Sequence, residues 1–214
     1  MNAGKSFWEM DELRIVSGAM VILSGATALM VVVPYLLLKD IQAPAALKPY
    51  TPTQLAGRQV YIANGCVYCH SQQPRDSKQA PDALRGWGRA SVAADYAYDT
   101  PHLLGTMRTG PDLLNIGARQ PSKDWHLGHL YQPRAYTPGS IMPSYPYLFE
   151  VRQGPAKPGE TVITLPPAYA KAGEVVIAKP EALALVDYLI ALDRTYVPLP
   201  ALPALTTPAA KGQP

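Results

Sequence analysis

The stretch Cys66-Val67-Tyr68-Cys69-His70 decides the fold of this 214-residue chain, because it predicts a group around which a core must form. Two cysteines three positions apart, followed directly by a histidine, are the pattern of a c-type haem attachment site. Each thiol can add across one vinyl group of the porphyrin, and one helical turn places both sulfurs on the same side. The imidazole of His70 then lies below the macrocycle, where it can bind the iron. The sequence therefore predicts one haem c, bound covalently through Cys66 and Cys69.

Two other interpretations of this spacing are weaker. A zinc site needs more cysteine or histidine at matching spacing, and the chain holds only these two cysteines. A redox-active dithiol of the thioredoxin type expects a βαβ context, which the sequence does not show. Because both cysteines belong to the motif, none is left for a disulfide, and the apolar faces of the haem are expected to supply much of the core.

A second decisive feature is the uncharged run from Ile15 to Leu38. About 20 apolar residues are enough for a helix to cross a bilayer. A cleaved signal peptide is the main alternative, and Ala43-Pro44-Ala45 loosely resembles a cleavage site. However, the run is longer than the apolar region of a signal peptide, and acidic residues precede it where a signal would be basic. We therefore expect an uncleaved anchor in the lipid bilayer.

The expected haem fixes the orientation of this anchor. Covalent haem attachment takes place on the outer side of the bacterial inner membrane, so the haem domain is predicted to be periplasmic. The formal net charge of +3 comes without a basic run, so no nucleic-acid partner is expected. The expected order is a cytoplasmic N-terminus (1–14), a transmembrane anchor (15–38), a linker (39–52), a cytochrome c domain (53–197) and a disordered tail rich in proline and alanine (198–214).

The anchor has a pattern of its own. Ser17-Gly18-Ala19 recurs seven residues later as Ser24-Gly25-Ala26, which places small side chains on one stripe of a helix. Such stripes allow transmembrane helices to approach closely, although small residues are also common in these helices without that role. Pro34 is expected to kink or end the regular helix, because proline lacks a backbone donor and its ring crowds the preceding turn.

The rest of the chain predicts a mainly α domain with one small β element. A helix is expected from about Thr53, a candidate N-cap, up to the haem motif. A second is expected from Glu181 to Arg194, where apolar residues recur at helical spacing. Two short β-branched runs, 161–165 and 174–178, predict a small hairpin. Residues 125–147 hold many aromatic residues and prolines and predict a structured loop.

A histidine alone leaves one axial position of the iron open. Methionine in that position gives a low-spin, electron-transferring haem with a raised potential. Met107 and Met142 are the two methionines that follow the anchor. Met142 is favoured, because prolines around it stiffen its loop into an extended path, whereas Met107 is expected to fill space in the core.

The segment Thr109–Leu113 has a different expected role. It resembles a segment of class I cytochromes c in which a proline carbonyl, here that of Pro111, accepts a hydrogen bond from the proximal histidine. Such a contact fixes the orientation of the imidazole. We therefore expect Pro111 to lie next to His70.

His102, His126 and His129 are the other candidate iron ligands, and any of them would give bis-histidine ligation. His126 and His129 are three residues apart, as metal ligands can be, but no third ligand at suitable spacing accompanies them. Trp125, His129 and Arg134 are interpreted as neighbours of the haem propionates, since an arginine fork pairs well with a carboxylate. The alternative for these three is that they are solvated surface residues.

Several segments together resemble one family. The block from Trp125 to Pro146 contains Trp-His-Leu-Gly-His-Leu-Tyr-Gln-Pro-Arg and ends in Met-Pro-Ser-Tyr-Pro. Together with Pro101–Leu103, Arg108–Leu113 and Cys66–Gln72, this block is similar to the membrane-anchored mono-haem subunit (subunit II) of cbb3-type cytochrome c oxidases. One N-terminal anchor, a linker and a cytochrome c domain are the layout of that subunit as well.

The resemblance implies a function in the respiratory chain. His70 and Met142 would be the axial ligands, and the chain would relay electrons to the membrane-embedded haem–copper catalytic subunit, which reduces oxygen. The donor would be another cytochrome c subunit or a soluble cytochrome c. Because oxygen chemistry needs an open iron position or copper, no catalysis is expected of the isolated chain.

Other functions stay open at this point. Residues 151–180 and the proline-rich tail do not match the pattern of the family. The small cytochrome c subunit of nitric oxide reductases shares the plan of one anchor and one haem. The further alternatives are a free-standing, membrane-tethered electron carrier and a haem enzyme with a labile sixth position, such as a peroxidase.

Overall fold

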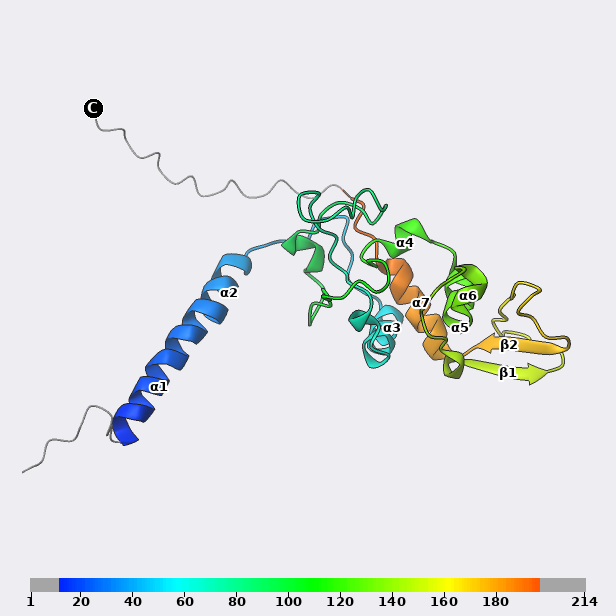
Figure 1. Ribbon diagram of the computed structural model, residues 1–214, viewed down its shortest axis with the longest axis horizontal. Helices are drawn as coiled ribbons and strands as arrows, with labels where there is room; N and C mark the ends of the chain where they lie inside the picture. Colours follow the sequence, from blue (N-terminus) through cyan, green and yellow to red (C-terminus); the bar gives the residue numbers. More distant parts are fainter. Residues whose placement is uncertain (1–11, 197–214) are drawn as a thin grey trace, which may run out of the picture. The chain divides into compact units, whose positions relative to one another are not determined.

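A long apolar helix opens the part of the chain that the structure describes, residues 12–196 of a computed structural model (Figure 1). Helical conformation continues from Glu12 to Leu38, over 27 residues, and the side chains are not buried in the protein. Length and composition suffice for a helix that crosses a membrane, as the sequence predicts. Among the described residues it is the one helix with these properties. The tail expected to be disordered, 198–214, lies outside the described residues.

The hydrogen bonding of this helix changes ahead of Pro34. α1 (Glu12–Thr27) is followed by a π-helical turn, η1 (Ala28–Val32), and then by α2 (Val33–Leu38). Proline has no N–H and its ring crowds the carbonyl four residues earlier, and the wider π-turn gives that carbonyl room. The sequence predicts that Pro34 kinks or ends the regular helix. Pro34 does not end it. It interrupts only the regular α-helical hydrogen bonding.

The second compact unit begins at Ala43 and is built around two packed helices. α3 (Pro52–Ala63) and α7 (Pro180–Ala191) lie side by side (Figure 1). Gly57 lies so close to Ala184 that a Cβ at this position would overlap the Ala184 carbonyl oxygen. The rings of Tyr61 and Tyr188 meet edge to face with centroids 5.6 Å apart, and both side chains are almost completely buried. These helices form the centre of the core.

The N-cap of α3 is Thr51, not Thr53 as expected. The Thr51 hydroxyl accepts a hydrogen bond from the Gln54 N–H at 3.3 Å, and the Gln54 side chain accepts one from the Thr51 N–H at 2.9 Å. This reciprocal pair is a capping box. Pro52 takes the first helical position, where its missing N–H is not needed. Three residues after Thr53 stands Ala56, which has no side-chain acceptor to complete such a box.

Short helices and long loops connect the two central helices. The expectation of a loop over 125–147 is correct for 137–145 but wrong for the residues before them, because Ser122 caps a helix by accepting a hydrogen bond from the Trp125 N–H at 3.2 Å. That capping residue and tertiary packing outweigh the weak helix propensity of the aromatic residues and histidines that follow. The connecting helices are η2 (Cys66–Tyr68), η3 (Ala93–Tyr96), α4 (Ile116–Arg119), α5 (Lys123–Tyr131), α6 (Pro133–Tyr136) and η4 (Pro146–Leu148).

The small sheet exists, but one of its strands was not expected. β1 (Phe149–Gln153) pairs antiparallel with β2 (Glu174–Ala178), with Phe149 opposite Ala178. The run 161–165, which the sequence predicts as the partner of β2, forms only an isolated bridge between Val162 and Ile177. Pro166 and Pro167 follow this run directly, and proline cannot donate to a ladder. The prediction of a mainly α fold with one apolar N-terminal helix and a small antiparallel sheet is confirmed.

Buried charges hold the long loops together. Arg108 donates to both carboxylate oxygens of the completely buried Asp82, at 2.6 and 2.7 Å, and to the Gln73 carbonyl at 2.7 Å. It thereby ties the loop that contains Pro111 to the loop that follows His70. Loops with few ladder hydrogen bonds need such side-chain partners for their buried polar groups. Further ion pairs of this kind join Arg89 to Asp95, and Arg58 and Arg194 to Asp99.

Substitution of Gly57 by alanine should destabilise the second unit. Alanine is the better helix former by about 1 kcal/mol, but its Cβ would force α3 and α7 apart, and overpacking costs about 1–3 kcal/mol. We expect a Tm several degrees below wild type by far-UV circular dichroism of the full chain in detergent. Gln59→Ala, at an exposed position of the same helix, is the control and should leave the Tm nearly unchanged. A Tm for Gly57→Ala at or above wild type would contradict the close packing.

Candidate haem site

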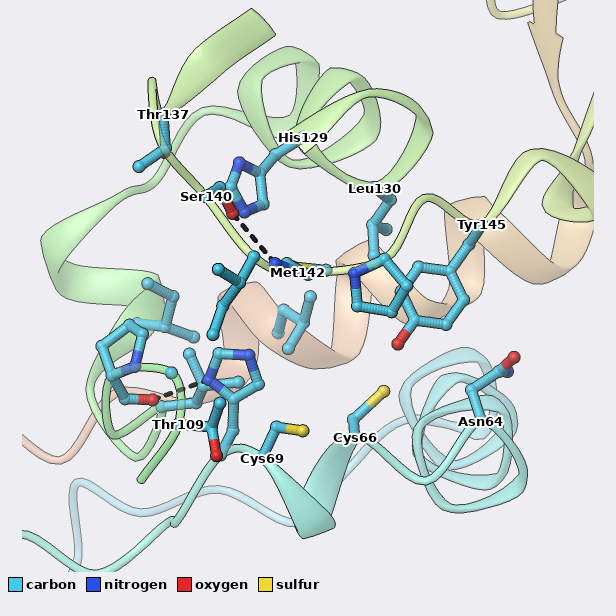
Figure 2. Close-up of a pocket in the computed structure, with 18 of the residues that line it drawn as sticks. Asn64, Cys66, Cys69, Thr109, His129, Leu130, Thr137, Ser140, Met142 and Tyr145 are labelled. Carbon is cyan, nitrogen blue, oxygen red and sulfur yellow. Dashed lines mark hydrogen bonds between the residues drawn. The ribbon is translucent and has the colours of Figure 1, made fainter. Parts of the chain in front are cut away.

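A cavity of about 650 Å³ in the second unit brings the predicted site residues together (Figure 2). Its walls are mostly apolar and come from three segments of the chain, 64–70, 109–116 and 125–145, together with Leu189 of α7. Cys66, Cys69 and His70 all line it. An apolar hollow with a few convergent polar groups is the usual form of a cofactor site.

The two cysteines lie on one tight turn. The Cys69 N–H donates to the Cys66 carbonyl at 3.2 Å, and the His70 N–H donates to the same carbonyl at 3.0 Å. Gly65 precedes the turn with φ of 66°, a left-handed conformation that lets the chain leave α3 abruptly. Both thiols are free. Burial raises the pKa of the Cys66 thiol to about 11, so it is protonated at neutral pH, unlike a redox-active thiolate.

The imidazole of His70 is fixed by one hydrogen bond. Its Nδ1 lies 2.7 Å from the Pro111 carbonyl oxygen, which is the contact expected from the sequence. Because a carbonyl can only accept, Nδ1 carries the proton and Nε2 keeps a lone pair. Burial lowers the pKa of His70, against the opposing effect of this hydrogen bond. The side chain is therefore a neutral imidazole with Nε2 available for a metal.

Backbone pairing places Pro111 beside His70. The Gly110 N–H donates to the Cys69 carbonyl at 2.9 Å, and the Leu113 N–H donates to the Ser71 carbonyl at 2.8 Å. Asp112, completely buried, accepts hydrogen bonds from the Ser71 hydroxyl at 2.6 Å and the Gln73 N–H at 2.7 Å. Burial raises the pKa of Asp112, with these hydrogen bonds opposing the shift. The role of Asp112 was not predicted from the sequence, although an acidic residue directly after Pro111 was a visible signal.

Met142 and Met107 have different surroundings. Met142 lines the cavity, on the side opposite Cys66 and Cys69 (Figure 2). Its N–H donates to the Ser140 hydroxyl at 3.2 Å, and the Tyr145 N–H ties the same loop to the Leu130 carbonyl at 2.9 Å. Met107 does not line the cavity and is 57% exposed, so the expectation that it fills the core is wrong. Its loop is held instead by the neighbouring Arg108.

α5 supplies the aromatic part of the wall. Trp125, His126 and His129 all line the cavity, and the rings of Trp125 and His129 stack with centroids 4.5 Å apart and an interplanar angle of 9°. His126 Nε2 donates to the Gln120 carbonyl at 2.8 Å. Arg134 is exposed and does not line the cavity, and its backbone carbonyl accepts a hydrogen bond from the Tyr169 hydroxyl. Within residues 12–196, no group of three or more His, Cys, Asp or Glu could hold a separate metal ion.

These residues fit a c-type haem. Two thiols lie on one side of an apolar cavity, a neutral imidazole enters it with Nε2 free, and a thioether faces it from the opposite side. Cysteine, histidine and methionine are the residue types that hold such a group. One apolar helix followed by a helical domain with this cavity is the layout of a membrane-anchored mono-haem cytochrome.

Comparison with known proteins gives the family. The sequence matches the family described as "Cytochrome C oxidase, mono-heme subunit/FixO" over residues 5–164. The chain therefore belongs to the mono-haem subunits of cytochrome c oxidase, and the resemblance to the cbb3-type subunit is confirmed. Membership implies one haem c. Among curated proteins no match was found.

Substitution of Gly110 by alanine should disturb the haem without touching a ligand. A Cβ at this position would overlap the His70 imidazole, so His70 would have to move away from the Pro111 carbonyl. We expect loss of low-spin character in the absorption and EPR spectra, and a lower yield of covalently bound haem. Thr109→Ala is the control, because it changes the adjoining wall residue without adding an atom near His70. Unchanged spectra for Gly110→Ala would contradict the geometry described for His70.

Proposed function

We propose that this chain is the electron-transfer subunit of a cbb3-type terminal oxidase and passes electrons to the haem–copper catalytic subunit. The observation that carries the proposal is the cavity to which Cys66, Cys69, His70 and Met142 all contribute. In this proposal both thiols hold one haem c as thioethers, and His70 and Met142 are its axial ligands. The haem, when bound, supplies a one-electron couple at its iron.

The protein residues restrict this couple to electron transfer. Pro111 keeps the proton of His70 on Nδ1, so Nε2 is presented as a ligand with fixed ring orientation. Met142, on the other side of the cavity, would hold the haem iron through its thioether, a ligand that favours reduced iron and raises the potential. With both positions filled, the chain offers no site for oxygen, and oxygen reduction belongs to the catalytic subunit.

The apolar N-terminal helix supports a membrane location for this relay. In the proposed arrangement it anchors the chain in the bacterial inner membrane, with the N-terminus in the cytoplasm and the haem domain in the periplasm. The donor is another cytochrome c subunit or a soluble cytochrome c. Trp125 is our proposed neighbour of a haem propionate, since it lines the cavity and its indole N–H can donate to a carboxylate.

Native mass spectrometry of the complex purified from its own membranes tests the proposal. We expect this chain to carry one haem that survives acid–acetone extraction and to co-purify with a large polytopic subunit. Purification of the chain alone, fully loaded with haem, would instead identify a free-standing membrane-tethered carrier. Absence of a covalently bound haem would refute the proposal.

The choice of axial ligand predicts different effects for two methionine substitutions. Met142→Ala should abolish the methionine–iron charge-transfer band of the oxidised protein, because it removes the proposed sulfur ligand. Met107→Ala is the matched control and should leave the band intact, since Met107 lies outside the cavity. Survival of the band in Met142→Ala would refute the assignment of this ligand.

The small-residue stripe of α1 predicts a contact with a membrane partner. Gly18 and Gly25 have no atom of the described chain within 4 Å of a Cβ built at either position, so a neighbouring helix could approach them. Gly25→Leu should reduce the amount of catalytic subunit that co-purifies severalfold while leaving haem attachment unchanged. Thr27→Leu, which points to the opposite side of the helix, is the control. Normal co-purification of Gly25→Leu would count against the stripe as a packing face.

A further inference from the structure

Three histidines have no part in the proposed electron relay. They differ in exposure, in whether they line the cavity, and in hydrogen bonding. His102 is exposed, lies edge to face with Tyr96, and does not line the cavity. His126 lines the cavity, but its Nε2 is engaged with the Gln120 carbonyl at 2.8 Å. His129 lines the cavity as well, and its Nδ1 is buried with no hydrogen-bond partner in the described part of the chain.

His129 lies on the same side of the cavity as the proposed sulfur ligand. Figure 2 shows His129 and Met142 on one side of the cavity, with Cys66 and Cys69 on the other. The ring of Trp125, one turn earlier in α5, stacks on the imidazole and holds its plane. A second nitrogen ligand is therefore available on the same wall as the thioether.

The imidazole of His129 is neutral and able to bind a metal. Burial, together with the smaller effects of the neighbouring His126 and His70, lowers its pKa to about 4. At neutral pH one ring nitrogen therefore keeps a lone pair. Of the histidines other than His70, His129 is the one that combines a place in the cavity wall with a ring that makes no hydrogen bond to the described residues.

We infer that His129 is a reserve axial ligand, which binds the haem iron when Met142 is lost or oxidised. This inference rests on the proposed function. The step is a ligand exchange: the iron–sulfur bond breaks, a bond from iron to an imidazole nitrogen forms, and no electron is transferred. The imidazole keeps its single proton on the nitrogen that does not bind iron.

The same geometry explains why Met142 is preferred over His129 as the axial ligand. If Nε2 binds the iron, the proton must stay on Nδ1, which is buried and has no acceptor among the described residues. A buried N–H without a partner is unfavourable. Movement toward the iron would also weaken the stack with Trp125. Thioether ligation avoids both costs, so methionine is the first ligand and histidine the second.

The exchange would keep the haem six-coordinate. Oxidation of a methionine thioether to the sulfoxide by a peroxide, which gives up one oxygen atom and is reduced by two electrons, is a common lesion that removes the soft sulfur donor. An open iron position would then bind small ligands and allow peroxidase chemistry. Ligation by His129 closes that position and lowers the potential relative to methionine ligation, so a damaged subunit would stop relaying electrons rather than react with oxygen species.

The test compares haem-loaded variants of the full chain, in detergent, by absorption, EPR and near-infrared magnetic circular dichroism. Met142→Ala should lose the methionine–iron band yet stay low-spin, with the near-infrared signature of bis-histidine ligation and no carbon monoxide binding. Met142→Ala/His129→Ala should become high-spin and bind carbon monoxide readily. Met142→Ala/His102→Ala is the matched control and should stay low-spin. Met142→Leu, with and without His129→Ala, repeats the comparison at conserved side-chain volume.

The outcomes are distinguishable. A high-spin, carbon monoxide-binding haem in both Met142→Ala and Met142→Leu would overturn the reserve ligand while leaving Met142 as the proposed first ligand. If Met142→Ala/His126→Ala became high-spin while Met142→Ala/His129→Ala stayed low-spin, His126 and not His129 would be the second ligand. That result would also overturn the inference. Survival of the methionine–iron band in Met142→Ala would contradict the proposed function itself.

Discussion

The hydrogen bond between His70 Nδ1 and the Pro111 carbonyl is the contact on which the site depends. It sets the tautomer of the imidazole, and so decides that Nε2 is free for a metal. The contact exists because residues 69–71 pair with residues 110–113 through backbone hydrogen bonds and through the buried carboxylate of Asp112. Gly110 is part of the same constraint, since any Cβ there would occupy the space of the imidazole.

Around this contact the protein forms a shell that encloses the cavity, next to an apolar core. Two helices, α3 and α7, cross closely enough to exclude a side chain at Gly57, and their buried side chains pack in one core with side chains from the short helices, the loops and the sheet. The rest of the wall consists of short helices and loops, whose buried polar groups are satisfied by ion pairs such as Arg108–Asp82. A large apolar prosthetic group would complete such a shell, which explains why a domain with so little regular structure surrounds a cavity of about 650 Å³.

The two sides of the cavity are built in different ways. The side with the cysteines is formed by one tight turn and one backbone pairing. The opposite side combines α5 with the loop of Met142, which is tied to α5 through the Tyr145 N–H. This second side holds both a thioether and an imidazole that makes no hydrogen bond to the described residues (Figure 2). In our inference, a wall made of two segments offers two kinds of ligand atom, a sulfur and a nitrogen, to one axial position of the haem iron.

Local patterns determined much of this protein from sequence alone. The Cys-x-x-Cys-His motif, the uncharged N-terminal run and the prolines around Met142 can each be recognised within a few residues, because the spacing for haem attachment, the length of a membrane helix and the stiffness of a loop are local requirements. The ligand role of Met142 is our proposal. Tertiary structure decided what depends on distant partners. It paired β2 along its length with β1 and left 161–165 with a single bridge to β2, made a helix of some of the residues expected to form a loop, and left Arg134 outside the cavity. It also singled out His129 among the histidines, because the burial and hydrogen bonding of a ring are set by what packs against it and not by its neighbours in sequence.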